Sequence, residues 1–365
     1  MQKVMFVGIG KRGEHCWLKL LLERKDIKIT SIVEPNLSRH EELRVNYPDL
    51  AEAHWYEDLD SALEAGEAAE TDFAVVTTPP MSHYEISVKL MDQGVDVLCE
   101  KPTVVLLEDA IKMAEQAKKQ NRFLWITQNF RFAESSQFLL NRVRSGEMGS
   151  AEMGTIAYHR NRDGKADWLN KYPLTMEYPM LLEQSEHHYD LMRYCYDREV
   201  VKIYSRMMNP SWSMYANQAT VNTIFEMERG MLVNYWGSWS SSHGYFDFQW
   251  RTDFAKGAII QKQLFSDVYV GKPDSEKLER MPIDIKPEDV MVSDARILLD
   301  KFVNRKQLTD FRGIPDIYDN LLTLALVFAT IESDRDSKAI YMDEFYKREG
   351  ITPFIRKRGL GKIVK

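Results

Sequence analysis

An acid, a histidine and a second acid share one helical spacing within the segment Leu182–Tyr194. Glu183, His187 and Asp190 stand at positions i, i+4 and i+7, which on an α-helix fall on one face. A histidine exchanges protons near neutral pH, and a carboxylate one turn away can orient its ring. The spacing therefore predicts a general acid–base site on this helix.

Two other interpretations of these residues stay open. An i, i+4 pair also suits metal ligation, but the sequence offers no obvious third ligand, so we expect no metal. The second alternative is that His187 is a structural residue whose ring is held by hydrogen bonds.

A lysine follows a short apolar run in Cys99-Glu100-Lys101-Pro102. If residues 96–99 form a strand of a parallel sheet, Lys101 lies at the carboxyl edge, where such sheets bind ligands. An ammonium group at that edge can stabilise an alkoxide or polarise a carbonyl. The alternative is an ordinary solvated lysine at the end of a strand.

The first residues of the chain combine a short apolar strand, a glycine turn and a helix. Residues 3–7 are followed by Gly8-x-Gly10-x-x-Gly13 and then by an apolar helical segment that reaches Glu23. This is the context that a dinucleotide-binding fingerprint requires. We expect the loop, with Lys11 and Arg12 inside it, to hold a pyrophosphate at the helix N-terminus.

The next strand pattern, residues 27–34, ends at a carboxylate. Glu34 lies 21 residues beyond Gly13, where an acid accepts hydrogen bonds from an adenosine ribose. A carboxylate there repels a 2′-phosphate, which favours NAD(H) over NADP(H). Arg39 complicates this interpretation, because a nearby arginine can hold that phosphate. Glu34 is alternatively an ordinary acid at a turn before Pro35.

A second loop with ligand-binding potential follows the fourth apolar run. In Thr77-Thr78-Pro79-Pro80-Met81-Ser82-His83 the prolines force an extended exit from the strand. The loop is either part of the nucleotide site or a rigid strand–helix turn. The complete set of residues expected to bind the cofactor is Gly8, Gly10, Lys11, Arg12, Gly13, Glu34, Thr78, Pro79, His83, Glu100 and Lys101.

The elements that must position these residues alternate along the first part of the chain. Strand patterns occur at residues 3–7, 27–34, 53–56, 72–77, 96–99 and 123–127, with helical patterns between them. Strands that are apolar throughout are typical of a parallel sheet covered on both faces. We therefore expect residues 1–128 to form an NAD-binding Rossmann domain, a doubly wound parallel sheet with right-handed crossovers.

The pattern changes beyond residue 128. Strand-like segments follow one another at residues 152–159, 200–208, 219–227, 231–238, 246–251, 258–263 and 268–270, with helices at 135–144, 181–195, 293–305 and 317–333. Residues 129–345 are therefore expected to form a substrate-binding and oligomerisation α/β domain with a large open, mostly antiparallel sheet. Helices would cover one face, and the other would meet a second subunit. Residues 346–365 form a basic C-terminal tail.

Composition narrows the classes of function. The 365 residues are 44% hydrophobic and 28% charged, with a net charge of −7, which argues against a nucleic-acid partner. The three cysteines have no close spacing, so neither a disulfide framework nor a zinc-finger pattern is available. The sequence shows neither a signal peptide nor an apolar run long enough to span a membrane, so we expect a cytoplasmic protein with no membrane partner.

Taken in order, these motifs resemble a known family. Gly-Ile-Gly-Lys-Arg-Gly, the acid at the end of the second strand, Thr-Pro-Pro-Met-Ser-His, Glu-Lys-Pro and the acid–x3–His–x2–Asp helix are similar to the glucose–fructose oxidoreductase/inositol dehydrogenase (Gfo/Idh/MocA) family. The resemblance covers nearly the whole chain. It implies a Rossmann domain followed by an α/β domain whose open sheet forms oligomer contacts, hence a homodimer or homotetramer.

The resemblance also implies roles for single residues. Lys101 matches the active-site lysine of the family, and His187 matches its catalytic histidine. Glu183 stands where an aspartate is usual, and the extra methylene alters the reach of its carboxylate. The substrate-binding residues implied are Arg131, His159, Asn161, Glu183, His187 and Asp190.

The expected activity is therefore hydride transfer between NAD(H) and a secondary alcohol of a sugar, cyclitol or related polyol. NADP is the less favoured cofactor. Two alternatives remain: a glycosidase or lyase that retains its NAD and is redox-neutral overall, and a non-catalytic protein that senses dinucleotides. Net production of NADH separates the first expectation from both.

Overall fold

The computed structural model describes residues 1–162, 171–283 and 292–355. Contacts divide the chain into two units. The first contains Met1–Asn129, Ala295–Leu321 and a segment that starts at Phe354, and the second contains Phe130–Asp294 and Leu322–Pro353. The first boundary lies one residue from the expected one. Residues 295–321, which the sequence analysis placed within a continuous second domain over 129–345, belong to the first unit. In the expected basic tail, 356–365 lie outside the described residues.

The described part of the first unit is built on a six-stranded parallel sheet with the order β3-β2-β1-β4-β5-β6. Its strands are β1 (Gln2–Val7), β2 (Ile27–Val33), β3 (His54–Tyr56), β4 (Phe73–Val76), β5 (Asp96–Cys99) and β6 (Leu124–Ile126). This is the strand order of a dinucleotide-binding doubly wound fold, which confirms the predicted fold class. All four residues of β4 are buried, as expected for a strand covered on both faces.

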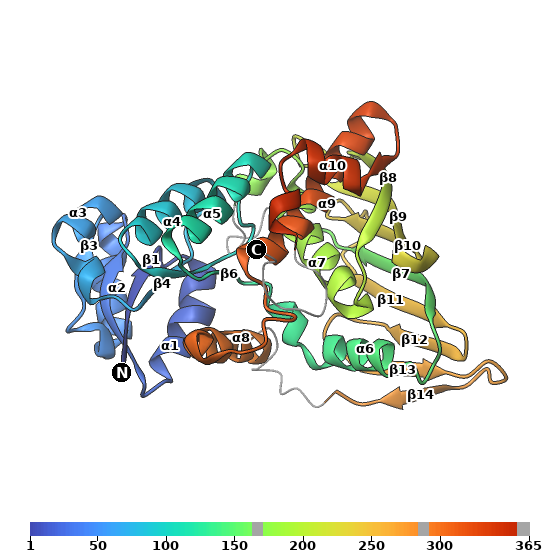
Figure 1. The fold of residues 1–365 in the computed structure, drawn as a ribbon, viewed down its shortest axis with the longest axis horizontal. Coiled ribbons are helices and arrows are strands. Elements are labelled where there is room, and N and C mark those ends of the chain that lie inside the picture. Colours follow the sequence, from blue (N-terminus) through green and yellow to red (C-terminus); the bar gives the residue numbers. More distant parts are fainter. Residues whose placement is uncertain (163–170, 284–291, 356–365) are drawn as a thin grey trace. The chain divides into compact units, whose positions relative to one another are not determined.

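Helices flank this sheet. They are α1 (Lys19–Leu22), which continues a π-helical turn at Gly13–Leu18, α2 (Leu37–Asn46), α3 (Leu59–Glu64), α4 (His83–Asp92), α5 (Leu107–Gln120) and α8 (Ser293–Val303). Figure 1 shows α4 and α5 side by side. The amphipathic pattern of α5 ends at Asn121, whose φ of 52° reverses the chain.

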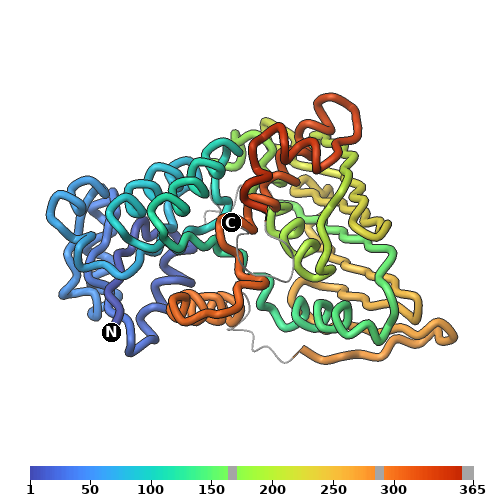
Figure 2. Tube along the Cα trace, viewed as in Figure 1, coloured from blue at the N-terminus to red at the C-terminus, as the bar shows by residue number. Residues whose placement is uncertain are grey.

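The late helix α8 packs beside α1, as the trace in Figure 2 shows. Ion pairs join Arg24 to Asp300 and Arg296 to Glu23 on this surface. Beyond α8, Arg305 is buried and donates from Nε to Asp96 of β5 at 2.8 Å. A buried guanidinium needs a carboxylate partner, so this pair explains why residues 295–321 belong to the first unit.

The described residues of the second unit include a nine-stranded sheet with the order β14-β13-β12-β11-β7-β10-β9-β8-β15. The strands are β7 (Ala151–His159), β8 (Val200–Met208), β9 (Thr220–Met227), β10 (Leu232–Ser238), β11 (Asp247–Phe254), β12 (Gly257–Gln261), β13 (Val268–Gly271), β14 (Leu278–Met281) and β15 (Ile340–Tyr341). Only β7 and β10 pair in parallel among these strands. The predicted open, mostly antiparallel sheet is therefore confirmed.

Helices of the second unit lie on one face of this sheet (Figure 1). They are α6 (Glu134–Ser145), α7 (Glu186–Tyr196), which continues a π-helical turn at Leu181–Ser185, α9 (Ile317–Asp336), whose first turn belongs to the first unit, and α10 (Met342–Arg348). Side chains of β8 alternate between buried and exposed, as a sheet with one covered face requires. Several large apolar side chains of this sheet are exposed: Met153, Val201, Tyr204, Met208, Ile224, Leu232 and Trp236.

The three cysteines, Cys16, Cys99 and Cys195, are buried and reduced. Burial raises the pKa of the Cys195 thiol, which makes it a poor nucleophile. These residues therefore serve as small core side chains. No helix within the described residues is both long enough and apolar enough to cross a membrane.

Candidate active site

The glycine loop after β1 packs against the loop after β4. A Cβ atom on Gly8 would lie 2.5 Å from Cγ2 of Thr78, and one on Gly13 would overlap Oγ1 of Thr77. At Gly10, by contrast, nothing lies within 4 Å of the Cβ position. Two glycines are thus required by close packing, and the third leaves open backbone that a pyrophosphate can approach. These residues fit a bound dinucleotide.

The carboxylate of Glu34 is held at the end of β2. The side chain is buried, and its oxygens accept hydrogen bonds from the backbone N–H of Ile9 at 2.8 Å and of Asn36 at 3.0 Å. The bond to Ile9 fixes the acid beside the glycine loop. Glu34 therefore stands where an adenosine ribose is bound in folds of this type.

Glu100, expected to contact the cofactor, joins two loops of the first unit. Its carboxylate is buried and accepts from Trp17 Nε1 at 2.6 Å, Arg12 Nε at 3.2 Å and the Lys101 N–H at 2.9 Å. Burial alone would raise the pKa of this carboxyl, but the charge of Arg12 and the bond from Trp17 hold it below its usual value. Glu100 thus ties the helix after β1 to the loop after β5.

His83, also expected to contact the cofactor, lies between two loops of the first unit. Its ring is buried, with Nδ1 2.9 Å from the carbonyl oxygen of Pro102 and Nε2 2.8 Å from that of Thr78. Burial lowers the pKa of this imidazole. Both ring nitrogens face backbone, so His83 braces the loops after β4 and β5. The second loop contains Lys101, whose peptide bond to Pro102 is cis.

In the second unit, the predicted acid and base are both buried. Glu183 lies in the π-helical turn that precedes α7, so the regular α-helical spacing assumed from the sequence begins only beyond it. Its carboxylate accepts a hydrogen bond from the hydroxyl of Tyr172. The ring of His187, in the first turn of α7, stacks on Phe130 with centroids 4.0 Å apart and an interplanar angle of 19°. Phe265 meets the ring of Phe130 edge-on.

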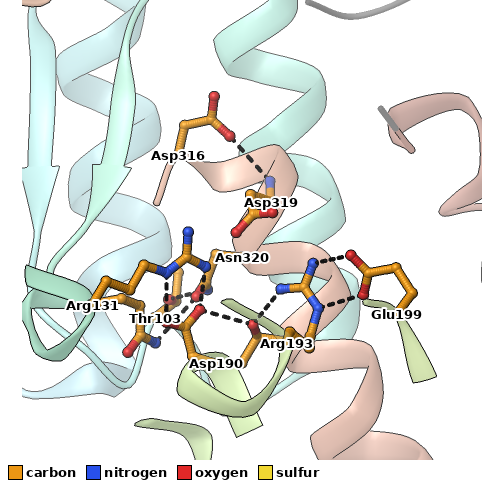
Figure 3. A network of polar contacts seen from close by, with 10 residues as sticks. Thr103, Arg131, Asp190, Arg193, Glu199, Asp316, Asp319 and Asn320 are labelled. Carbon is orange, nitrogen blue, oxygen red and sulfur yellow. Dashed lines mark hydrogen bonds and ion pairs between the residues drawn. The ribbon is translucent and has the colours of Figure 1, made fainter. Parts of the chain in front are cut away.

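A buried polar network lies one turn beyond His187 (Figure 3). Arg131 and Asp190 form a bidentate pair in which Nε of Arg131 donates to Oδ2 at 2.6 Å, and both side chains are at most 2% exposed. The hydroxyl of Thr323 donates to Asp190 at 3.1 Å and accepts from Arg193, which pairs with Glu199. Arg131 and Asp190 are thus engaged with each other, and their expected contact with substrate stays a prediction.

The other two substrate-binding candidates lie at the end of β7. The ring of His159 meets Trp236 edge-on at 5.4 Å, and burial lowers the pKa of its imidazole. Asn161 forms an isolated bridge with Ser240. Their contact with substrate stays a prediction.

The predicted residues therefore divide between the units. Lys101 and the expected cofactor residues belong to the first unit, and Glu183, His187 and the other substrate candidates belong to the second. Across residues 1–162, 171–283 and 292–355, no group of three or more His, Cys, Asp or Glu side chains is arranged to hold a metal ion.

Two family profiles match this chain. The one described as "Oxidoreductase family, NAD-binding Rossmann fold" covers residues 2–128, and the one described as "GFO/IDH/MocA C-terminal domain" covers residues 137–260. The chain belongs to the Gfo/Idh/MocA oxidoreductase family. As a member of that family it is an oxidoreductase with an NAD-binding Rossmann fold.

Several proteins resemble this Gfo/Idh/MocA chain along its sequence. The uncharacterized protein y4oX of Sinorhizobium fredii is 24% identical over 94% of this chain and 96% of its own length. The scyllo-inositol 2-dehydrogenase (NAD(+)) of Bacillus subtilis is 22% identical over 66% of this chain and 68% of its own. D-glucoside 3-dehydrogenase of Escherichia coli is 26% identical over 46% of this chain and 45% of its own.

Solved structures share the fold. An oxidoreductase from Agrobacterium radiobacter, in complex with NAD+, L-tartaric acid and magnesium, superposes with a TM-score of 0.82 at 17% identity, over 94% of this chain and 99% of that one. An inositol dehydrogenase homolog from Azotobacter vinelandii, complexed with NADH and myo-inositol, gives a TM-score of 0.78 at 15% identity, over 93% and 97%.

Three contacts at these sites were not anticipated from the sequence. They join Trp17 to Glu100, Phe130 to His187 and Tyr172 to Glu183. The two residues of each pair are far enough apart in the sequence that no helical or strand periodicity relates them. Two of the pairs contain a local signal, because a tryptophan or tyrosine that is removed from water normally needs a polar partner.

The buried pair of Arg131 and Asp190 gives a test of how the second unit is held together. Asp190→Leu leaves a buried guanidinium without its carboxylate, which should lower the free energy of unfolding by about 3–5 kcal/mol. The double variant Arg131→Met/Asp190→Leu removes both charges and should regain much of that loss. Urea unfolding of the full chain measures both.

The matched control is Arg144→Met, which breaks an exposed pair with Asp197 in the same unit. Its effect should stay below about 1 kcal/mol. A double variant no more stable than Asp190→Leu alone would contradict this account of the pair.

Proposed function

We propose that this protein is an NAD(H)-dependent oxidoreductase that transfers hydride between nicotinamide and a secondary alcohol of a sugar, cyclitol or related polyol. The observation that supports this most is the setting of His187: a buried imidazole fixed flat against Phe130 on the helix that continues from Glu183. A base with a fixed ring plane suits removal of a proton from a positioned hydroxyl.

The bound cofactor would accept or supply the hydride, and the residues of the chain do the rest. Gly8, Gly10 and Gly13 would hold the pyrophosphate, and Glu34 the adenosine ribose. The acid at that position favours NAD(H) over NADP(H). Glu100 and His83 hold the loops of the nucleotide site in place, so we assign them positioning roles.

Each remaining polar residue has a separate role in the proposal. In oxidation, His187 accepts the proton of the substrate hydroxyl, and the ammonium group of Lys101 stabilises the negative charge that develops on the oxygen. Glu183 orients the histidine or contacts the substrate, with Tyr172 holding its carboxylate. His159 and Asn161 would contact other hydroxyl groups. Arg131 and Asp190 would position α7.

The choice of a polyol is supported by the names of relatives, which include dehydrogenases of an inositol and of a D-glucoside. Apart from the nicotinamide, which would take up the hydride, transfer from a secondary alcohol needs only groups that the chain supplies: a base and a cationic stabiliser. A metal is not part of the proposal.

Purified protein incubated with NAD+ and a panel of inositols, glucosides and sugar acids should produce NADH, seen by its absorbance, with at least one member. NADP+ should support a lower rate at equal concentration. Bond cleavage of a glycoside with firmly retained NAD and without net NADH would favour the redox-neutral alternative. Cofactor binding with no reaction of any kind would favour the sensing alternative.

Removing the base or the cation should separate chemistry from binding. His187→Ala should lower turnover by about 10²–10⁴-fold, because it removes the proton acceptor. Lys101→Met keeps most of the side-chain volume but removes the charge, and should lower single-turnover hydride transfer by roughly 10²-fold or more. His187→Ala should bind NADH with nearly unchanged affinity, and Lys101→Met should leave the fold and the adenosine end of the cofactor site intact. Cofactor fluorescence measures NADH binding in both.

The matched controls are His188→Gln and Lys112→Met. His188 is the next residue of α7, but its Nδ1 is bonded to the hydroxyl of Tyr235, and Lys112 is an exposed lysine of the first unit. Turnover in these controls should stay close to that of the wild type. Wild-type turnover in His187→Ala or Lys101→Met would show that the assigned role is wrong.

We further propose that the exposed face of the nine-stranded sheet forms the contact of a homodimer or homotetramer. Exposed apolar side chains lie on adjacent strands there, since Tyr204 is paired with Ile224 and Leu232 with Met153. Apolar area of this kind is typical of protein–protein interfaces.

Ile224→Glu places a charge in this face and should lower the mass measured by light scattering to that of a smaller assembly. The control Val45→Glu adds the same charge at an exposed apolar residue of the first unit. Its mass should equal that of the wild type. An unchanged mass for Ile224→Glu would remove this face as the interface.

A further inference from the structure

Arg39 lies beside the expected ribose site but is clamped between two carboxylates. It stands in the first turn of α2, five residues beyond Glu34. One terminal nitrogen donates to Glu42 at 2.6 Å, and the other donates to Glu14 at 2.5 Å and to the carbonyl oxygen of Ile9 at 3.5 Å. Burial alone would lower the pKa of this guanidinium, but Glu14 and Glu42 raise it. Arg39 therefore stays charged, with that charge already balanced.

Glu14 is the less exposed of the two carboxylates. Its side chain is 12% exposed, against 52% for Glu42. It lies in the helix that follows the glycine loop, and its second oxygen accepts from the hydroxyl of Tyr47 at 3.2 Å. Burial and the nearby Glu14 raise the pKa of Tyr47, so the phenol stays protonated and keeps donating. With both oxygens engaged, Glu14 is fixed in the position that engages Arg39.

The backbone of Ile9 connects this clamp to Glu34. Its N–H donates to the carboxylate of Glu34, and its carbonyl oxygen accepts from Arg39. Two carboxylates, Glu14 and Glu42, thus engage the guanidinium of Arg39, and a third, Glu34, is bonded to the same residue of the glycine loop. A 2′-phosphate brings about 1.5–2 further negative charges at neutral pH, judged by the usual second pKa of phosphate monoesters.

We infer that Glu14 determines the choice between NAD and NADP in this protein, by withholding Arg39 from a 2′-phosphate. The inference rests on the proposed NAD(H) dependence. Arginine binds phosphate through paired N–H donors, and in Arg39 one N–H of each terminal nitrogen is directed at a carboxylate. Glu34 repels the phosphate, and Glu14 engages the guanidinium of Arg39 that would otherwise offset this repulsion.

Binding affinities for nucleotides test the inference, and their measurement does not depend on catalytic activity. Glu14→Gln keeps the shape of the side chain and its acceptor for Tyr47 but removes the charge. Isothermal titration of the full chain with NAD+, NADP+, 5′-AMP and 2′,5′-ADP should show NADP+ and 2′,5′-ADP binding about tenfold more tightly in this variant, one charge-assisted bond being gained. The affinities for NAD+ and 5′-AMP should change much less. The gain should shrink at high salt.

Three further variants identify the cause. Glu41→Gln removes a carboxylate from the same helix, at a solvent-exposed position next to Glu42, and controls for net charge alone. Arg39→Ala/Glu14→Gln should abolish the gain, because the gain acts through the guanidinium. Glu42→Gln removes the carboxylate bonded to the other terminal nitrogen of Arg39 and should increase the affinity for NADP+ by a smaller factor. This variant still allows a measurement if Glu14→Gln fails to fold.

Two results would overturn the inference, and they are distinguishable. If the wild type binds NAD+ but Glu14→Gln shifts the NADP+/NAD+ ratio no more than Glu41→Gln does, Glu14 is not the determinant and the proposed function stands. If the wild type binds neither dinucleotide nor adenosine nucleotide, the proposed function fails and this inference fails with it.

Discussion

A carboxylate removed from water must be given donors, and in the first unit this requirement fixes the loops of the nucleotide site. Glu100 is buried at the end of β5, and the groups that satisfy it come from the helix after β1 and from the backbone of the next residue. The helix that would receive the pyrophosphate and the loop that carries Lys101 are therefore set by one side chain. His83 adds a second brace by spanning Thr78 and Pro102.

The second unit also contains a buried carboxylate whose hydrogen bonds are satisfied by a charged partner. Asp190 is paired with Arg131, and each of these residues is close in sequence to a member of the stacked rings, since Phe130 precedes the arginine and His187 lies one turn before the aspartate. The ion pair and the stack therefore hold the same short segment against α7. In both units a side chain suited to chemistry stands next to a buried acid whose hydrogen bonds are satisfied.

Much of this could be predicted from the sequence, because the strands and most helices carry local patterns. The strands of the parallel sheet are continuous apolar runs, and α5 begins and ends where its amphipathic pattern does. The short β14, β15 and α10 have too few residues to show a period. The return of Arg305 to Asp96 and the clamp of Arg39 by Glu14 join residues that no local pattern relates. Likewise, the residues on either side of His83 in the sequence gave no sign that its ring would face two carbonyl groups.

The π-helical turn at Leu181–Ser185 has a consequence for how relatives of this protein can diverge. Such a turn contains one residue more than the α-helix around it, so a deletion there can be absorbed by a return to regular winding, with the helix unbroken. The same event would rotate Glu183 about the helix axis relative to His187. Evolution can thus redirect the acid by changing the length of the chain instead of the identity of a residue, and a comparison that scores substitutions alone would overlook it.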